Sequence, residues 1–132
     1  MTIELKEFDL SPLESALSSL KEAFENPPRN DLERDGAIQR FEFTFELSWK
    51  VIRKFLKSLG RHEISGSPKP LFRDALEEGL IDQIEEWFEF LEARNLTSHI
   101  YSKKQAEKVY TMAKNFPPFV EKLLQQIKKK IS

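Results

Sequence analysis

Residues 30–60 read NDLERDGAIQRFEFTFELSWKVIRKFLKSLG, and this stretch decides the fold. Asn30 is a favoured N-cap residue and Gly60 a favoured stop, so the stretch predicts one long helix that ends near Leu59. Apolar residues recur along it at helical spacing in two stripes, one of Ile38, Phe41, Phe45, Trp49, Ile52 and Leu56, the other of Phe43, Leu47, Val51 and Phe55. A helix that is apolar on two sides has neighbours on both, so we expect it at the centre of the fold.

A shorter helix is predicted on each side of it in the sequence. Ser11-Pro12-Leu13-Glu14 has the pattern of a capping box with proline at the first helical position, and the helix that it starts ends at Asn26-Pro27-Pro28. After a polar loop over 61–66, Ser67-Pro68 starts a short helix that Gly79 closes.

Two more helices complete the chain. Residues 81–95 predict a fourth helix, with an apolar stripe of Ile84, Trp87, Phe88 and Leu91. Ser102-Lys103-Lys104-Gln105 is a second capping box, and the stripe of the helix after it continues to Ile131 through Pro117-Pro118, which must kink or break it. The expected fold is all-α: an up-and-down four-helix bundle with a short extra helix and a proline-broken C-terminal helix, in a single domain over 1–132.

The amino-acid composition excludes several kinds of site and indicates where the protein is located. The chain has no cysteine, which excludes a disulfide, a thiolate metal site and a thiol nucleophile. It begins MTIELKE, without an apolar run, so no signal peptide is expected. No stretch approaches the roughly 18 uninterrupted apolar residues of a membrane span. We therefore expect a soluble, cytoplasmic protein that does not associate with membranes.

Charge is unevenly distributed along the chain. Residues 1–100 carry 13 Lys and Arg against 20 Asp and Glu, a net charge of −7, whereas residues 101–132 carry 8 against 2, a net charge of +6. Such asymmetry is compatible with binding to nucleic acid. The simpler explanation is that these charges are the solvated faces of amphipathic helices.

The segment Arg94-Asn95-Leu96-Thr97-Ser98-His99-Ile100-Tyr101 falls at the turn between the last two predicted helices. Arg94 follows Leu91 by three residues and Trp87 by seven, which places it on the inward stripe, where a guanidinium must find a buried partner or point into a groove or a subunit interface. One interpretation is unspecialised: a cationic residue that stabilises a helix C-terminus, followed by a surface histidine.

The other interpretation is a phosphodiester-cleaving pair. His99 can take a proton from a ribose 2′-hydroxyl or give one to the leaving 5′-oxygen, and Arg94 can bind the phosphate and stabilise the charge that develops on it. RNA supplies its own nucleophile, so neither a metal ion nor another cofactor is expected. One arginine and one histidine make a sparse site, and a two-fold homodimer that brings these turns together would double it.

Other candidate residues have structural explanations. His62 lies in a polar loop and is interpreted as an ordinary surface residue. Glu42 and Glu46, flanked by Arg40 and Lys50, could form an acid/base pair, but ion pairs within the helix are the preferred explanation. The aromatic residues of the long helix are interpreted as core and not as a platform for stacking bases.

Two segments of the sequence resemble the motifs of a known protein family. RFEFTFELSWK at 40–50 is similar to the signature of the nucleotidyltransferase substrate-binding protein family, a branch of the HEPN superfamily. The segment at 94–101 resembles the HEPN motif of Arg, four residues, His, any residue, Tyr, and Asn95 also fits that pattern. Helix order and length agree with the family over essentially the whole chain.

The resemblance implies a function. HepT-like members are homodimeric, metal-independent ribonuclease toxins, and their antitoxin, a minimal nucleotidyltransferase, transfers AMP from ATP to the motif tyrosine. Carried over, Arg94 and His99 would be catalytic in an endoribonuclease, Tyr101 would be the modified residue, and Asn95, Thr97 and Ser98 would support the site. The partners would be RNA, a second copy and the cognate nucleotidyltransferase.

An alternative function stays open. The family was first described as the substrate-binding subunit of a two-component nucleotidyltransferase, which would make the chain a non-catalytic binding module. The Arg94, His99 and Tyr101 combination favours the ribonuclease, because an adaptor does not need it. The acidity of residues 1–100 counts against it, unless the basic C-terminal helix folds beside the turn.

Overall fold

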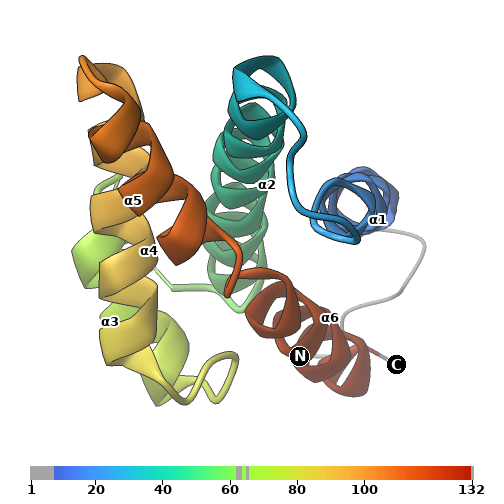
Figure 1. Ribbon diagram of the computed structural model, residues 1–132. Helices are drawn as coiled ribbons and strands as arrows, with labels where there is room; N and C mark the ends of the chain where they lie inside the picture. The colour runs from blue at the N-terminus through green and yellow to red at the C-terminus, as the bar shows by residue number, and fades with distance from the viewer. Residues whose placement is uncertain (1–7, 62–63, 65, 132) are drawn as a thin grey trace.

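A computed structural model describes residues 8–61, 64 and 66–131, and the regular secondary structure of these residues is helical (Figure 1). None of the helices in this part of the chain is long and apolar enough to cross a membrane. In chain order the elements are α1 (Ser11–Ala23), α2 (Asp31–Ser58), α3 (Pro68–Glu77), α4 (Ile84–Leu96), the 3₁₀ turn η2 (Thr97–His99), α5 (Lys103–Ala113) and α6 (Pro117–Lys130).

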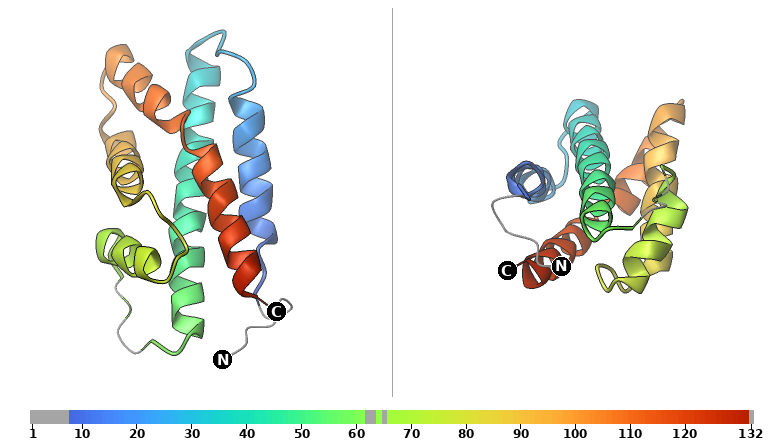
Figure 2. Two further views of the ribbon diagram at one scale, coloured as in Figure 1. Left: turned by 90° about the horizontal axis from the view of Figure 1, so that it is seen from below. Right: turned by 180° about the vertical axis from the view of Figure 1, so that it is seen from behind.

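The long helix α2 is central, as its two apolar stripes predict. It packs against α1 on one side and against α3, α4 and α5 on the other, while α6 closes the bundle against α1 (Figures 1 and 2). The four members of the bundle are α1, α2, α4 and the divided α5–α6 element, and α3 is the short extra helix. This arrangement confirms the predicted all-α bundle.

The helix termini confirm one predicted N-cap and correct another. The Asn30 side chain accepts a hydrogen bond from the Glu33 backbone N–H at 2.9 Å and starts α2 as predicted. Ser11 does not cap α1: Leu10 occupies the N-cap position, and the Asp9 carboxylate accepts the Ser11 N–H at 2.9 Å. The capping-box prediction at Ser11 was wrong because the acceptor lies two residues earlier in the chain.

Aromatic rings fill the centre of the bundle. The fully buried Phe116 ring lies 4.9 to 5.8 Å, between centroids, from four others: Phe41, Phe45, Trp87 and Phe90. The expectation that the aromatic residues of the long helix belong to the core is therefore confirmed for Phe41, Phe45 and Phe55. It is wrong for Phe43, which is 60% exposed and lines a surface groove between α1 and α2.

The breaks between helices follow the predicted residues, with one shift. α5 ends at Ala113 and Pro117 opens α6, so the prolines divide the last helix. Gly60 and Gly79 take positive φ angles of 83° and 77° after α2 and α3, a backbone region that glycine enters without strain. The fourth helix begins at Ile84 and not at 81, and its buried face includes Phe90 and Ala93, which the predicted stripe omitted.

Candidate functional site at the α4–α5 junction

Residues 94–101 join α4 to α5, and two apolar side chains attach this junction to the bundle. Leu96 and Ile100 pack against a small cluster of buried residues formed by Ile38 of α2 with Ala106 and Val109 of α5. α4 ends at Leu96, and His99 closes the 3₁₀ turn that follows, as the expected turn position requires. The polar side chains of the junction are thereby held at the surface.

The start of α5 fixes the backbone of Tyr101. The Ser102 hydroxyl accepts the Gln105 N–H at 3.2 Å, and the Gln105 side-chain oxygen accepts the Tyr101 N–H at 2.7 Å. These reciprocal bonds confirm the predicted capping box. They set the direction in which the chain leaves the turn and therefore the position of the tyrosine.

His99 and Tyr101 lie together and face solvent. The imidazole Nδ1 is 3.2 Å from the Tyr101 hydroxyl oxygen, within hydrogen-bond distance. The Tyr101 side chain is 79% exposed, although large aromatic side chains are usually covered. An exposed phenol beside an exposed imidazole is accessible to both a macromolecular substrate and a modifying enzyme.

Arg94 faces α2, as its position on the inward stripe predicts, but it is not fully buried. Its side chain keeps 36% of its accessible surface and forms an ion pair with Glu46. Its Nη1 also donates to the Asn95 side-chain oxygen at 3.3 Å. Within the described residues no hydrogen bond joins Arg94 to His99. The structure therefore brings His99 and Tyr101 together, whereas Arg94 contacts Glu46 and Asn95 instead.

Two carboxylates of α2 reach this junction, and the sequence did not predict them as part of the site. Glu46 pairs with Arg94, and the Glu42 carboxylate accepts a hydrogen bond from the Thr97 hydroxyl at 2.5 Å. The preferred explanation of ion pairs within α2 was therefore wrong. Arg40, one of the two flanking basic residues expected to pair with them, donates instead to the Ser19 carbonyl of α1 at 2.9 Å.

Of the remaining polar residues of the segment, one forms hydrogen bonds with its surroundings and the others are exposed to solvent. Thr97 can also donate to the Arg94 carbonyl at 2.6 Å, so its single proton serves either that oxygen or Glu42. Asn95 and Ser98 are exposed. His62 lies outside the described residues. In the part of the chain that the structure describes, no group of three His, Asp or Glu side chains is placed to hold a metal ion.

Two exposed lysines lie beside the junction. Lys103 and Lys104 directly follow it, exposed in the first turn of α5. The basic end of α6 is elsewhere, because Lys130 lies beside Gly79, at the far end of α4 (Figure 2). α4 has 13 residues, which at 1.5 Å per residue separate the two ends by about 20 Å. The condition that the basic C-terminal helix folds beside the turn is therefore met by the start of α5 and not by the basic end of α6.

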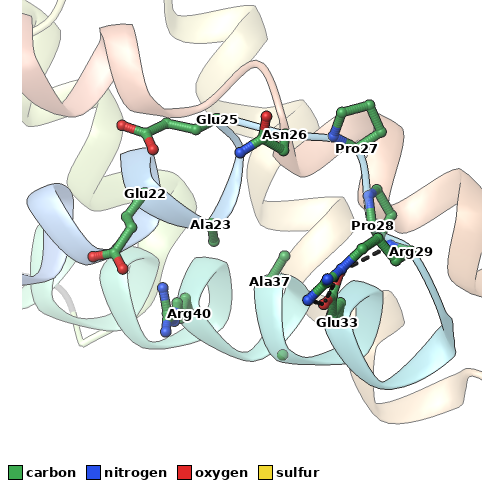
Figure 3. Close-up of a pocket in the computed structure, with 11 residues that line it drawn as sticks. Glu22, Ala23, Glu25, Asn26, Pro27, Pro28, Arg29, Glu33, Ala37 and Arg40 are labelled. Atoms are coloured by element: carbon green, nitrogen blue, oxygen red, sulfur yellow. Dashed lines mark hydrogen bonds and ion pairs between the residues drawn. The ribbon is translucent and has the colours of Figure 1, made fainter.

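A surface cleft of about 730 Å³ lies at the connection between α1 and α2, away from the junction (Figure 3). Arg29 and Glu33 project into it and form an ion pair with each other at 2.6 Å. Residues 94–101 do not line this cleft. Arg40, which also lines the cleft, donates to the Ser19 carbonyl of α1, so the three basic and acidic groups Arg29, Glu33 and Arg40 all have protein partners.

Residues 8–129 match the family described as nucleotidyltransferase substrate binding protein like. The chain belongs to this family. The match includes both α2 and the α4–α5 junction, so it covers the signature at 40–50 as well as the motif at 94–101. The family resemblance stated on the sequence is thereby confirmed.

The chain is also similar to individual proteins in sequence and in structure. The probable ribonuclease HepT of Haemophilus influenzae is 35% identical over 98 residues, which are 72% of this chain and 67% of that protein. A crystal structure from Thermus thermophilus superposes with a TM-score of 0.80 at 31% identity, over 88% of this chain and 98% of that one. A second structure, from Haemophilus influenzae and described as revealing the fold of a substrate binding domain of a nucleotidyltransferase, has a TM-score of 0.77 at 31% identity, over 91% of this chain and 99% of that one.

Proposed function

We propose that this family member is a metal-independent endoribonuclease, the cytoplasmic toxin of a toxin–antitoxin pair, in which Arg94 and His99 are catalytic. The observation that carries the proposal is the exposed contact between His99 and Tyr101, 3.2 Å apart, on the junction that also presents Arg94. A helix cap alone would not need an imidazole and a phenol held together in solvent. The similarity to the protein named probable ribonuclease HepT supports the same conclusion.

The proposed reaction uses the 2′-hydroxyl of RNA as the nucleophile. A His99 imidazole removes the 2′-hydroxyl proton while the 2′-oxygen forms a bond to phosphorus, and the bond from phosphorus to the 5′-oxygen breaks. The departing 5′-oxygen takes up a proton from a second, protonated imidazole, which leaves a 2′,3′-cyclic phosphate and a 5′-hydroxyl. Arg94 stabilises the charge that builds on the phosphate oxygens.

A homodimer would complete this site. Each junction supplies one arginine and one histidine, whereas the reaction needs both a base and an acid. Two junctions related by a two-fold axis supply two of each. Sedimentation or size exclusion with light scattering should then find a mass of twice 15.5 kDa. A strictly monomeric but active protein would show that one junction is sufficient.

The proposed control of this activity is adenylylation of Tyr101 by a cognate minimal nucleotidyltransferase. The 79% exposed phenol is accessible to another enzyme without unfolding. Its oxygen would form a bond to the α-phosphorus of ATP as pyrophosphate leaves. The added nucleotide would then lie beside His99, where it fills the place of the RNA phosphate and opposes the charge of Arg94.

A second candidate is a non-catalytic subunit that presents a substrate to a nucleotidyltransferase. The description of the matched family and of one solved relative favours it. The location of the α6 lysines far from the junction also favours it, because fewer cations remain for RNA at the site.

Co-expression separates the two functions. The ribonuclease proposal predicts that the chain alone arrests growth, that a cognate nucleotidyltransferase relieves the arrest, and that AMP is then found on the Tyr101 peptide by mass spectrometry. Normal growth with the chain alone and an unmodified Tyr101 after co-expression would favour the substrate-binding subunit.

A further inference from the structure

Glu46 is the acidic residue of α2 that contacts Arg94, and no function follows for it from the motif at 94–101. We infer that Glu46 is a positioning residue, which holds the Arg94 guanidinium ready for an RNA phosphate. This inference rests on the proposed function, since the phosphate belongs to the RNA that is cut. It adds a residue from another helix to a site that the motif alone does not complete.

The Glu46 carboxylate is itself held in place. One oxygen, Oε1, pairs with Nη2 of Arg94, and the other, Oε2, accepts a hydrogen bond from the Trp49 indole N–H at 3.0 Å. The carboxylate keeps only 25% of its accessible surface. Oε2 is thus fixed by a hydrogen bond, whereas Oε1 is buried and has the Arg94 guanidinium as its ion-pair partner without a hydrogen bond.

The α2 helix around Glu46 is closely packed. Its neighbours Phe45 and Ser48 are fully buried, and the Ser48 hydroxyl donates to the Thr44 carbonyl at 2.8 Å. A site built on a packed helix holds its geometry better than one built on a loop. The α2 helix therefore provides a fixed reference for an arginine that sits in the last turn of α4.

Arg94 keeps donors for a ligand in this arrangement. A guanidinium has five N–H groups, and the contacts of Arg94 use one each on Nη1 and Nη2. In the described part of the chain its Nε donates to no protein acceptor, and the side chain is about one-third exposed. The ion pair thus fixes the orientation of the arginine without consuming its capacity to bind phosphate.

The negative charge of Glu46 should also weaken RNA binding, and this second effect allows its role to be tested. Its negative charge lies beside the place where a phosphodiester would bind, so it opposes RNA binding while it orients Arg94. Replacing the charge should leave RNA affinity unchanged or raise it, and should slow the cleavage step. A residue with a purely structural role would not slow cleavage while RNA affinity is unchanged or raised.

The experiment compares Glu46→Gln with wild type in steady-state RNA cleavage. Gln has the same shape and can still accept the Trp49 N–H, so the fold should persist. We expect kcat to fall about 10- to 100-fold, the range for a misplaced catalytic group, with KM unchanged or lower. Glu46→Asp should recover part of kcat, and Glu92→Gln, an exposed carboxylate on α4, serves as the matched control with wild-type kinetics.

A second measurement keeps the inference separate from the ribonuclease proposal. The heteronuclear NOE of the Arg94 Nε–H reports the mobility of the guanidinium whether or not RNA is cut, and it should be high in wild type and low in Glu46→Gln. If wild type cuts no RNA but this difference is found, the ribonuclease proposal fails and the holding of Arg94 by Glu46 stands. Equal mobility in both proteins, a wild-type kcat in Glu46→Gln, or a raised KM with kcat unchanged would overturn the inference.

Discussion

His99 and Tyr101 share a contact in which the imidazole Nδ1 lies 3.2 Å from the phenol oxygen. Because Nδ1 is engaged there, Nε2 is the ring nitrogen left for an incoming substrate. The same contact places any group added to the phenol oxygen beside the imidazole. Catalysis and its suppression would therefore take place on neighbouring atoms of one turn.

Tyr101→Phe should separate these two roles. A neutral hydrogen bond contributes about 1 kcal/mol, or roughly fivefold, so RNA cleavage should fall by no more than that. Adenylylation should be lost completely, because the acceptor oxygen is gone. In cells that also express the nucleotidyltransferase, this variant should stay toxic. A Tyr101→Phe protein that the partner still silences would show that another residue is modified.

The cap of α5 contributes to stability and to the position of Tyr101. Ser102→Ala removes the acceptor for the Gln105 N–H and should lower the free energy of unfolding by about 1 kcal/mol. Ser11→Ala is the matched control, because no side chain caps α1 from that position, and its change should stay within about 0.5 kcal/mol. Urea denaturation measures both, and equal losses would contradict the two assignments.

The aromatic core should respond very differently at two phenylalanines. Phe116→Ala removes a fully buried ring that contacts four others and should lower the free energy of unfolding by about 3–5 kcal/mol. Phe43→Ala makes the same chemical change at a 60% exposed position and should cost no more than about 0.5 kcal/mol in the monomer. Guanidinium denaturation of both variants tests whether α2 is oriented as described.

The start of α2 makes a prediction about pH. The Arg29 side chain, and then its backbone N–H, hydrogen-bond to Glu33 and hold the pKa of that carboxyl below its ordinary value. The carboxylate form is therefore favoured in the folded state. Its contribution to stability is present above the unfolded pKa of about 4.3 and is lost as the pH falls through the folded pKa.

An NMR titration of the Glu33 side chain checks this sign. Its pKa should be low in wild type and should rise toward the ordinary value in Arg29→Ala. The difference in stability between the two proteins should be present at neutral pH and should disappear in acid. A Glu33 pKa that does not change in Arg29→Ala would mean that another group lowers it.

Much of the fold could be predicted from the sequence because local signals and packing agree there. Asn30, Ser102, Gly79 and Pro117 each act within a few residues, and the structure places helix ends at all four. The prediction that Ser11 caps α1 was wrong because the nearby Asp9 carboxylate accepts a hydrogen bond from the Ser11 N–H. The prediction that Phe43 belongs to the core was wrong because helical spacing locates an apolar stripe but does not show which of its residues a neighbouring helix covers.

The candidate site could be predicted only in part, because some of its residues lie far apart in the sequence. The motif at 94–101 is contiguous, so its position between two helices follows from their caps. The carboxylates that contact it lie some fifty residues earlier, and Glu42 and Glu46 have basic neighbours that offer a local explanation. Only the packing of α2 against α4 shows that these carboxylates meet Thr97 and Arg94.

The most direct test of the central claim is RNA cleavage by the purified chain with excess EDTA present. We predict that wild type cuts RNA to products with 2′,3′-cyclic phosphate ends, and that His99→Ala and Arg94→Ala, each folded as judged by circular dichroism, are inactive. Cleavage that persists in both variants, or that requires a divalent metal ion, would contradict the assignment of Arg94 and His99 as a metal-independent catalytic pair.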